Sequence, residues 1–418
     1  MRNFTFKGLL LTAVFMLLGY LSIQAANDDL ITKQITIKLE EAGTLPNKIA
    51  SSEMYKITNL KIIGEINGTD WRMIREMAGR DYWGDVTKGN LSVLDLSEAK
   101  IVKGGDSYYP GDNCYTSNDE IGEKAFTDCS RLTSLILPVG ITSIGYDAFA
   151  YCSGLTSLTL PAGITSIGEY AFYGCSGLTS LNLPAGITEI GESTFSDCSG
   201  LTSLTLPDGI TSIGSRAFYG CSGLTSLTLP AGITSIGDDI FYGCSGLTSL
   251  TLPAGITSIG EYAFSGCSGL TSLTLPAGIT SIDKYAFSGC SRLTSLTLPA
   301  GITSIGEFAF SYCSGLTSIY VYAEKVPRIG RYAFEGCASR KCTLYVPKGT
   351  YDNYRLSEFG YFENIVEFDA TGIDKTTTST DVEEVSRYSA DGQRLAVPVK
   401  GLNIVKYSDG TARKVVVK

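Results

Sequence analysis

Apolar and polar residues alternate in short runs that return at a fixed spacing through most of this chain. Between 155 and 177, the segment LTSLTL alternates leucine with serine and threonine. A strand turns successive side chains to opposite faces, so Leu158 and Leu160 are expected to face a core and the hydroxyls to face solvent. The turn segment PAG follows. Each copy therefore predicts one short, half-buried strand that ends in a turn.

The second half of the same copy carries another set of apolar positions. Ile164 and Ile167 predict a second apolar edge, and Gly168 permits a bend. We interpret the segment EYAF that follows as one helical turn, with three residues pointing inward: Ala171, Phe172 and Cys175. About eight apolar side chains per copy would then line a core that continues from copy to copy.

The strand segments share a period of 23 residues. Nine of them begin at Leu132, Leu155, Leu178, Leu201, Leu224, Leu247, Leu270, Leu293 and Leu316. Less regular copies begin at Ile57 and Leu91 before this array and at Cys342 after it. A fixed period of this size predicts a solenoid, because one such unit cannot bury its apolar face alone. We expect about twelve coils at roughly 4.8 Å each, a body some 50 to 60 Å long.

The first 26 residues predict a secretory signal peptide. A basic start, MRNFTFK, precedes an apolar run of 16 residues, and Ala25 and Ala26 offer a cleavage site. A membrane-spanning helix needs roughly 20 apolar residues, so we interpret the run as a leader and expect no transmembrane span in the mature chain. No cysteine follows the cleavage region, so a lipid anchor is not indicated.

Every copy also contains a cysteine. These residues stand 23 apart from Cys129 to Cys313, and Cys337 follows after 24. An exported protein meets oxidising conditions, and neighbouring coils are close enough for disulfides. However, a cysteine at the same inward position of each copy is typical of a packing residue, and equivalent copies offer no pairing scheme. We therefore expect a ladder of buried free thiols, with a bridge between Cys337 and Cys342 left open.

Composition shifts divide the chain further. Residues 67 to 79 predict a capping helix, and the aromatic-rich stretch after Gly349 suits a cover for the last coil. A threonine-rich segment then precedes a tail of short β-like runs joined by Asp-Gly turns. The expected parts are 1–26, signal peptide; 27–131, N-terminal cap and degenerate repeats; 132–347, regular repeats with a terminal coil; 348–368, C-terminal cap; 369–386, linker; and 387–418, a small β module.

Charge and composition narrow the function. The chain has a net charge of −9, and residues 132 to 316 hold 11 acidic side chains against three basic ones. Nucleic-acid binding needs a basic face, so no nucleic-acid partner is expected. Histidine is absent, which removes Ser-His-Asp and Cys-His catalytic pairs and histidine zinc sites. We expect no enzymatic activity, no cofactor and no metal.

The repeat LPAGITSIGEYAFSGCSGLTSLTLP resembles the unit of the BspA-like leucine-rich-repeat family of bacterial surface proteins. The resemblance covers residues 57 to about 366 and is carried by the LP-x-G-I-T-x-I-G edge and the A-F-x-x-C turn. Gly163 stands where the general leucine-rich pattern has asparagine or cysteine, so the usual asparagine ladder is missing. The resemblance implies an exported adhesin that binds host proteins or other cells without catalysis.

The predicted fold class is an α/β repeat solenoid. It is a leucine-rich-repeat-like, right-handed coil of short parallel strands and short helical turns, with capped ends and a small all-β C-terminal module. The tail is similar to the C-terminal β modules of exported proteins in the Bacteroidetes, which implies a sorting signal. Leu402 stands where a tyrosine is common, and a plain capping or spacing module remains the alternative.

Two surfaces compete for a partner. The outward strand positions form hydroxyl ladders, which we interpret mainly as sheet stabilisation: Ser157, Ser180, Ser203, Ser226, Ser249, Ser272 and Ser295, with Thr159, Asn182, Thr205, Thr228, Thr251, Thr274 and Thr297. The edge near the expected helical turn varies from copy to copy and is rich in aromatic residues. It is our candidate binding surface: Tyr151, Tyr170, Tyr173, Tyr219, Tyr242, Tyr262, Tyr285, Phe308 and Tyr312, mixed with Asp147, Arg216, Asp238 and Asp239.

Tyrosine offers a large contact area, a polar tip and a small entropic cost, which favours recognition of an extracellular protein or cell-surface ligand. Two alternatives stay open at this point. The rings would serve equally as flat platforms for a glycan, which makes a carbohydrate-binding surface module the second hypothesis. They would also serve as a simple shield over the core.

Overall fold

The computed structural model describes residues 29–111, 114–370, 384–389, 394–395, 401–407 and 412–417. It divides the chain into two compact units, Met1–Phe368 and Asp369–Lys418. The predicted signal peptide lies outside the described residues, and so does most of the predicted linker, from 371 to 383. The predicted domain boundaries therefore stay predictions.

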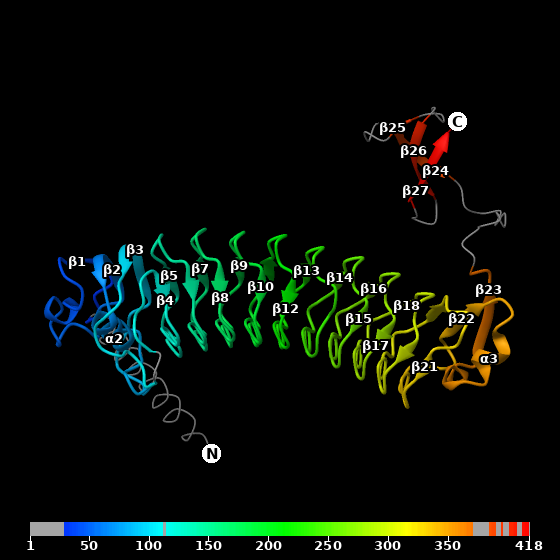
Figure 1. The fold of residues 1–418 in the computed structure, drawn as a ribbon, viewed down its shortest axis with the longest axis horizontal. Helices are drawn as coiled ribbons and strands as arrows, with labels where there is room; N and C mark the ends of the chain where they lie inside the picture. The colour runs from blue at the N-terminus through cyan, green and yellow to red at the C-terminus, as the bar shows by residue number, and fades with distance from the viewer. Residues whose placement is uncertain are drawn as a thin grey trace, which may run out of the picture. The chain divides into compact units, whose positions relative to one another are not determined.

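The first unit is a solenoid whose turns stack in parallel (Figure 1). In its described part, fourteen short strands follow one another along one side: β1 (Ile35–Lys38), β2 (Asn59–Ile66), β3 (Val93–Ile101), β5 (Ser134–Ile136), β7 (Ser157–Thr159), β9 (Ser180–Asn182), β11 (Ser203–Thr205), β13 (Ser226–Thr228), β14 (Ser249–Thr251), β16 (Ser272–Thr274), β18 (Ser295–Leu298), β20 (Ser318–Val321), β22 (Thr343–Pro347) and β23 (Asn364–Phe368). The expected number of coils was about twelve. The difference arises because β1 and β23 add a parallel strand at each end.

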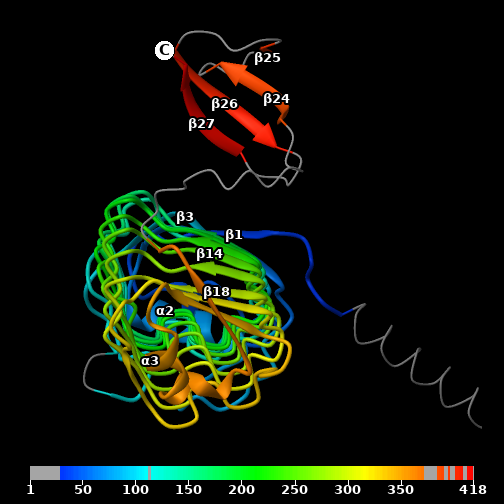
Figure 2. The ribbon, with the colours of Figure 1, turned by 90° about the vertical axis from the view of Figure 1, so that its right-hand side faces the viewer.

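Neighbouring coils pair in register, so equivalent residues lie side by side. Ser249 pairs with Ser226 on one side and with Ser272 on the other. The alternation expected from the sequence is confirmed, because Leu158 and Leu160 are buried while Ser157 and Thr159 are exposed. Figure 2 looks along the solenoid and shows the turns superposed.

The second apolar edge is also confirmed as a line of two-residue strands: β4 (Glu120–Ile121), β6 (Ser143–Ile144), β8 (Ser166–Ile167), β10 (Glu189–Ile190), β12 (Ser212–Ile213), β15 (Ser258–Ile259), β17 (Ser281–Ile282), β19 (Ser304–Ile305) and β21 (Arg328–Ile329). A single bridge between Ile236 and Ile259 continues the line through the copy that has no named strand here. Ile164 and Ile167 are both buried.

Phenylalanine rings form a continuous column in the core. From Phe126 to Phe334, successive ring centroids lie 5.1 to 5.8 Å apart with interplanar angles of 3° to 12°. Each ring is almost completely buried, which makes this column a large share of the hydrophobic stabilisation.

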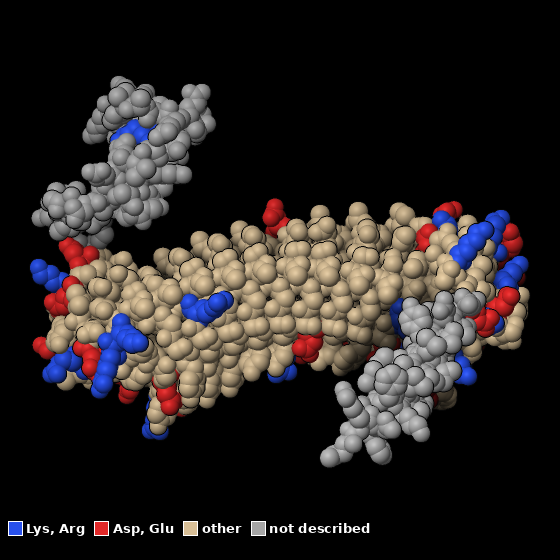
Figure 3. Space-filling model, turned by 180° about the vertical axis from the view of Figure 1, so that it is seen from behind, with Lys and Arg blue, Asp and Glu red and all other residues tan. Residues whose placement is uncertain are grey.

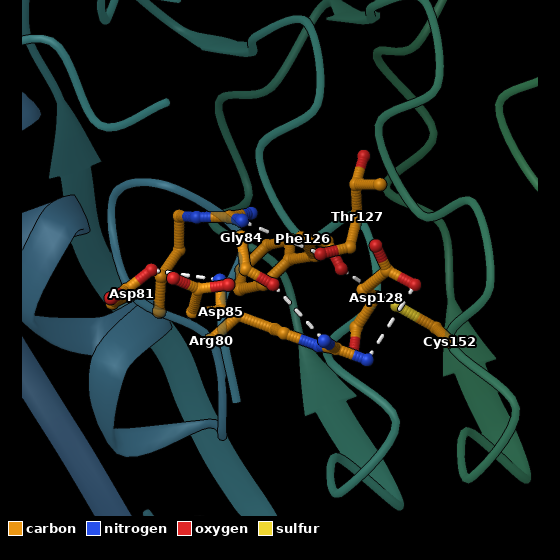
Figure 4. Close-up of polar contacts among 9 residues, drawn as sticks. Arg80, Asp81, Gly84, Asp85, Phe126, Thr127, Asp128 and Cys152 are labelled. Atoms are coloured by element: carbon orange, nitrogen blue, oxygen red, sulfur yellow. Dashed lines mark hydrogen bonds and ion pairs between the residues drawn. The ribbon is translucent and has the colours of Figure 1, made fainter. Parts of the chain in front are cut away.

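The cysteines are buried and unbridged, as the ladder hypothesis expects. All twelve are free, Cys337 and Cys342 included. From Cys152 onward, each periodic Sγ donates to the carbonyl of the phenylalanine in the preceding coil, at 3.0 to 3.3 Å (Figure 4). Burial raises the pKa of Cys175 to about 12, so the thiol stays protonated at neutral pH.

The expected helical turn at 169–172 is wrong. The segment is a non-helical turn, and Tyr170 has a φ of 57°, in the left-handed region. The amide of Ala171 bonds within the coil to Gly168 O at 3.3 Å, whereas the amide of Phe172 bonds to Thr194 O of the next coil at 2.9 Å. A helix would satisfy its amides internally, and the stack instead offers acceptors from the neighbouring coil.

Side chains of the N-terminal segment donate hydrogen bonds to the backbone carbonyls of the first regular turn, residues 123–128. Helix α2 (Gly68–Met77) follows the 3₁₀ turn η1 (Leu45–Asn47) and begins after the N-cap Asn67. Trp71 Nε1 donates to Ala125 O at 2.9 Å, and Tyr108 Oη donates to Glu123 O at 2.9 Å. Arg75 Nη1 donates to Lys124 O and Ala125 O. Arg80 Nε donates to Asp128 O at 3.1 Å, and Figure 4 shows Arg80 beside Asp128. Between regular coils, backbone amides of one turn donate to carbonyls of the next turn. At this end of the array, the side-chain donors take the place of those amides.

At the other end of this unit, α3 (Tyr351–Arg355) and the 3₁₀ turn η2 (Glu358–Tyr361) precede β23. Phe359 and Phe362 contact the last ring of the phenylalanine column, Phe334, at centroid distances of 5.4 and 5.2 Å. The second unit contains an antiparallel sheet in the order β25 (Arg394–Leu395), β24 (Glu384–Ser389), β26 (Gly401–Tyr407), β27 (Ala412–Val417). Its role as a sorting or spacing module stays a prediction.

Candidate functional site

Two backbone positions in each coil lie in the left-handed region, and the candidate tyrosines cluster around them. The first position has φ between 51° and 58° and is never glycine in the described coils: Lys124, Asp147, Tyr170, Ser193, Arg216, Asp239, Tyr262, Tyr285, Phe308 and Tyr332. The second position is glycine in six coils and a larger residue in four: Asp128, Tyr151, Asp197 and Tyr312. The left-handed conformation raises the conformational energy of a non-glycine residue by roughly 1 to 2 kcal/mol, whereas glycine adopts it without this cost.

In the later coils, the aromatic rings of this edge stack face to face. Tyr219 and Tyr242 lie 4.7 Å apart at 5°, and Tyr262 and Tyr285 lie 4.7 Å apart at 4°. Phe308 continues the second stack at 4.9 Å. Parallel stacking covers the faces of these rings, so they present mainly their edges to solvent.

In the earlier coils, four rings are tilted against one another, and we call Tyr146, Tyr151, Tyr170 and Tyr173 the tyrosine cluster. Tyr151 and Tyr173 meet at 5.1 Å and 80°. Tyr170 meets Tyr146 at 5.5 Å and 56°, and Tyr173 at 6.0 Å and 52°. Gly174 makes room for this arrangement, because a Cβ there would lie 2.9 Å from Tyr151 Cδ1.

The copy that follows the cluster departs from the repeat. In the segment GESTFSDC, Ser193 and Ser196 occupy the positions that Tyr170 and Tyr173 occupy one coil earlier. Both serines are buried, and the missing rings leave a cavity of about 540 Å³. We call it the tyrosine cleft; it is lined by the tyrosine cluster with Asp147, Ser193, Ser196, Asp197, Arg216 and Tyr219.

The cleft carries more negative than positive charge. Burial raises the pKa of the Asp147 carboxyl, and the Asp197 carboxylate fits beside Gly220, where a Cβ would lie 2.3 Å from Asp197 Oδ1. Arg216 Nε lies 3.3 Å from Asp239 Oδ2, so a carboxylate outside the lining offsets its charge. On the face shown in Figure 3, charged side chains are sparse over the central coils and gather toward both ends of the solenoid.

Hydrogen bonding and burial raise the pKa of two phenols of the cluster, Tyr170 and Tyr173. Tyr170 Oη donates to Glu192 Oε1 at 2.7 Å, and this bond is the main cause of the raised pKa of Tyr170. Burial, together with Tyr151 and Asp197, raises the pKa of Tyr173 to about 12. At neutral pH the cleft therefore offers ring faces, phenol hydroxyls and carboxylate oxygens. Such a set can bind a polar or cationic group.

The structure brings together half of the predicted tyrosines. Tyr151, Tyr170, Tyr173 and Tyr219 line the cleft, and the predicted neighbours Asp147 and Arg216 do so as well. The others lie along the edge outside it: Tyr242, Tyr262, Tyr285, Phe308, Tyr312, Asp238 and Asp239. The binding role of the whole set stays a prediction.

Sequence reasoning missed Tyr146, Ser193, Ser196 and Asp197, which also line the cleft. The available signal was the departure of the copy at 178–200 from the repeat, where serines replace the tyrosines of the preceding copy.

The threonine that precedes each strand forms a hydrogen-bonded column, whereas the stabilising role of the predicted serine and threonine ladders stays a prediction. Thr156 Oγ1 donates to Thr133 O at 3.0 Å, and this pattern repeats at 23-residue intervals as far as Thr317. Ser157 and Thr159 remain exposed. The described residues contain no group of three or more Cys, Asp or Glu side chains placed to hold a metal ion. None of the helices in the described part combines the length and apolar character that a membrane crossing needs.

Solved structures of bacterial leucine-rich repeat proteins are similar to this chain. A leucine-rich repeat protein from Bacteroides ovatus ATCC 8483 is 30% identical over 55% of this chain and 65% of its own length, with a TM-score of 0.43. The leucine-rich repeat protein of T. pallidum is 33% identical over 40% of this chain and 75% of its own, with a TM-score of 0.35. One from Eubacterium ventriosum ATCC 27560 is 25% identical over 55% of this chain and 64% of its own, with a TM-score of 0.36.

No curated protein matches the chain significantly. The family model for the BspA type leucine rich repeat region matches residues 119–248 and 234–353 in 6 copies. These stretches together cover more than half of the 418 residues, and they contain the repeated turn, the periodic buried thiols and the tyrosine cleft. The chain belongs to the BspA-type leucine-rich repeat family.

Proposed function

We propose that this protein is an exported binding protein of the cell surface or the surrounding medium, an adhesin that recognises host extracellular proteins or other cells without catalysis. The observation that carries the proposal is the tyrosine cleft, a cavity of about 540 Å³ in an otherwise regular solenoid. Membership of the BspA-type family supports a binding role, since repeat solenoids present extended surfaces to partners.

The contrast between the two surfaces supports the cleft as the place of contact. The strand face repeats the same exposed serine and threonine in coil after coil, so a ligand would meet many equivalent registers. The cleft occurs where two coils differ from their neighbours, and it combines aromatic rings with carboxylates. Binding hot spots are enriched in aromatic residues and depleted in serine and threonine.

Export is proposed on the basis of residues 1–26, whose charged start, apolar run and small residues have the features of a leader. N-terminal sequencing of the protein recovered from cells should find a mature chain that begins near residue 27. A chain that still begins at Met1 in the cytoplasm would contradict the export part of the proposal.

The binding test compares the purified protein with two triple variants. The first carries Tyr170→Ser, Tyr173→Ser and Tyr219→Ser, which introduce the residue that Ser193 and Ser196 supply in the neighbouring coil. The second carries Thr159→Ser, Thr205→Ser and Thr228→Ser on the strand face. We expect the tyrosine variant to lose binding to immobilised extracellular-matrix proteins and whole bacterial cells, and the threonine variant to keep it.

Circular dichroism should show both variants folded. Loss of binding in the threonine variant alone would move the site to the strand face. Retention of a neutral oligosaccharide by the cleft, without any protein ligand, would favour the carbohydrate-binding hypothesis instead.

A further inference from the structure

We infer that the tyrosine cleft holds a cationic side chain, the guanidinium of an arginine or the ammonium of a lysine, that projects from a protein partner. The inference rests on the proposed function and names the chemistry of the contact. Three independent features of the cleft support it: the tilt of its rings, the backbone conformation of Tyr151, and the balance of its charges.

The rings of the tyrosine cluster are arranged as the walls of a cage. Tyr151 and Tyr173 are nearly perpendicular, at 80°, and Tyr170 is tilted by 52° to 56° against its neighbours. A cation is attracted to ring faces because the π-system carries negative charge there, and cages of tilted rings suit such ligands. The stacked rings of the later coils cannot act in this way because their faces cover one another.

The protein already places one of its own cations against this cluster. Lys124 Nζ lies 6.0 Å from the centroid of Tyr146 and 3.6 Å from Glu123 Oε1. Lys124 is not part of the cleft lining, so the cavity itself remains open to an external group.

Tyr151 occupies a backbone position whose left-handed conformation is unfavourable for any residue but glycine. Its φ is 58°, its side chain is 51% exposed, and the equivalent residue is glycine in six other coils. A left-handed conformation costs a non-glycine residue roughly 1 to 2 kcal/mol, and an exposed ring recovers only part of this by burial. Completing the cage is a function that glycine would not provide.

The charges of the lining favour a cation over an anion or a neutral ligand. Asp147 and Asp197 face the cavity, whereas the lining cation Arg216 lies beside Asp239. The surrounding array, from 132 to 316, holds 11 acidic and three basic side chains. This excess would attract a basic partner over a distance of about 8 Å at physiological salt. An anionic ligand would meet repulsion.

A glycan fits the cleft less well. Sugars lie flat on a broad ring platform, whereas the rings of the tyrosine cluster are tilted by 52° to 80° and share no common plane. The cavity of about 540 Å³ is larger than one side chain. It would therefore also hold the partner's backbone next to the arginine or lysine.

The experiment titrates the purified full chain with Nα-acetyl-arginine amide by isothermal calorimetry, and with the neutral isostere Nα-acetyl-citrulline amide in parallel. We expect saturable binding of the arginine probe, at least tenfold weaker binding of the citrulline probe, and weaker arginine binding as salt is raised. A neutral oligosaccharide is titrated as a third ligand.

Two variants test the cage and the charge. Tyr151→Gly introduces the residue that six coils already carry, so the fold is preserved, and Asp197→Asn keeps the shape of the side chain. Each should weaken arginine binding at least tenfold. The matched controls are Tyr312→Gly, the exposed tyrosine at the equivalent position of another coil, and Asp208→Asn, a carboxylate in an exposed turn. Both controls should bind the probe as the parent does.

The inference is overturned if citrulline binds as well as arginine, if Tyr151→Gly and Asp197→Asn leave arginine binding unchanged, or if only the oligosaccharide binds. Its failure can be separated from failure of the proposed function. If the arginine probe does not bind while Tyr170→Ser, Tyr173→Ser and Tyr219→Ser still abolish partner binding, the proposed function stands and the cationic contact is wrong. If the probe binds at the cleft and no extracellular protein or cell does, the adhesin proposal fails.

Discussion

The buried thiols predict that this solenoid loses stability steeply above pH 9. In the folded protein, burial raises the pKa of Cys175 and of Cys267 to about 12, from an ordinary value of 9.0. The unfolded chain therefore releases these protons near pH 9 while the folded chain keeps them. Rising pH then favours the unfolded chain, and the effect runs from about pH 9 until the folded thiols ionise near pH 12.

The magnitude follows from the separation of the two pKa values. At pH 10 each of these thiols lowers the free energy of unfolding by about 1.4 kcal/mol relative to neutral pH. Burial raises the pKa of further thiols in the same column well above 9.0, among them Cys152, Cys198 and Cys221. Because a domain is stable by only about 5 to 15 kcal/mol, several such thiols together are enough to unfold the solenoid near pH 10.

The assay is urea unfolding, followed by circular dichroism, between pH 7 and 10.5 in the presence of a reductant. The matched variant carries Cys175→Ala and Cys267→Ala, which remove two titrating groups from the column. Its free energy of unfolding should fall less steeply with pH, by about 1.4 kcal/mol per pH unit for each thiol removed. A parent protein with constant stability from pH 8 to 10, or a variant with an unchanged slope, would refute the reasoning.

Three further predictions concern the array. Phe241→Ala removes a fully buried ring between Phe218 and Phe264 and should lower the free energy of unfolding by roughly 3 to 5 kcal/mol in urea denaturation. Deleting one whole copy, 224–246, should leave a folded, shorter solenoid with the parent's circular dichroism per residue, because the new junction repeats an existing one. Arg75→Met leaves Lys124 O and Ala125 O without that donor and should cost about 2 to 3 kcal/mol, whereas Arg72→Met, at an exposed position, should cost less than about 1 kcal/mol.

The repeat predicted most of the fold because its apolar positions are the same in every copy. The inward leucines follow from the alternation, and the isoleucine edge and the buried cysteines follow from apolar residues at the same place in every copy. The non-helical turn at 169–172 was not predicted from the sequence. EYAF contains good helix formers, and the acceptor that competes for the Phe172 amide, Thr194 O, lies in the next coil. Strands β1 and β23 escaped notice because ITIK and NIVEF share none of the repeat's turn residues.

The candidate site was predictable only in part. The tyrosines stand out in the sequence, but whether two rings stack in parallel or meet at an angle depends on their backbone positions. Tyr219 and Tyr242 occupy equivalent positions in successive coils and therefore stack. Tyr151 and Tyr173 occupy different positions in successive coils and meet at 80°. The cavity depends on serines that carry no chemistry of their own and matter only because their neighbours are large.

A solenoid of nearly identical coils faces a particular difficulty in recognition. If every coil presents the same side chains, a ligand gains the same energy in each register and no position is preferred. A single departure removes this degeneracy, because only the coils that flank it can contribute to the new surface. Here the copy at 178–200 supplies the departure, and Tyr151 adds a ring at a position that is glycine in six other coils. The regular coils provide a rigid frame, and the exceptions within them define a cleft where a partner's side chain would be held in a single register.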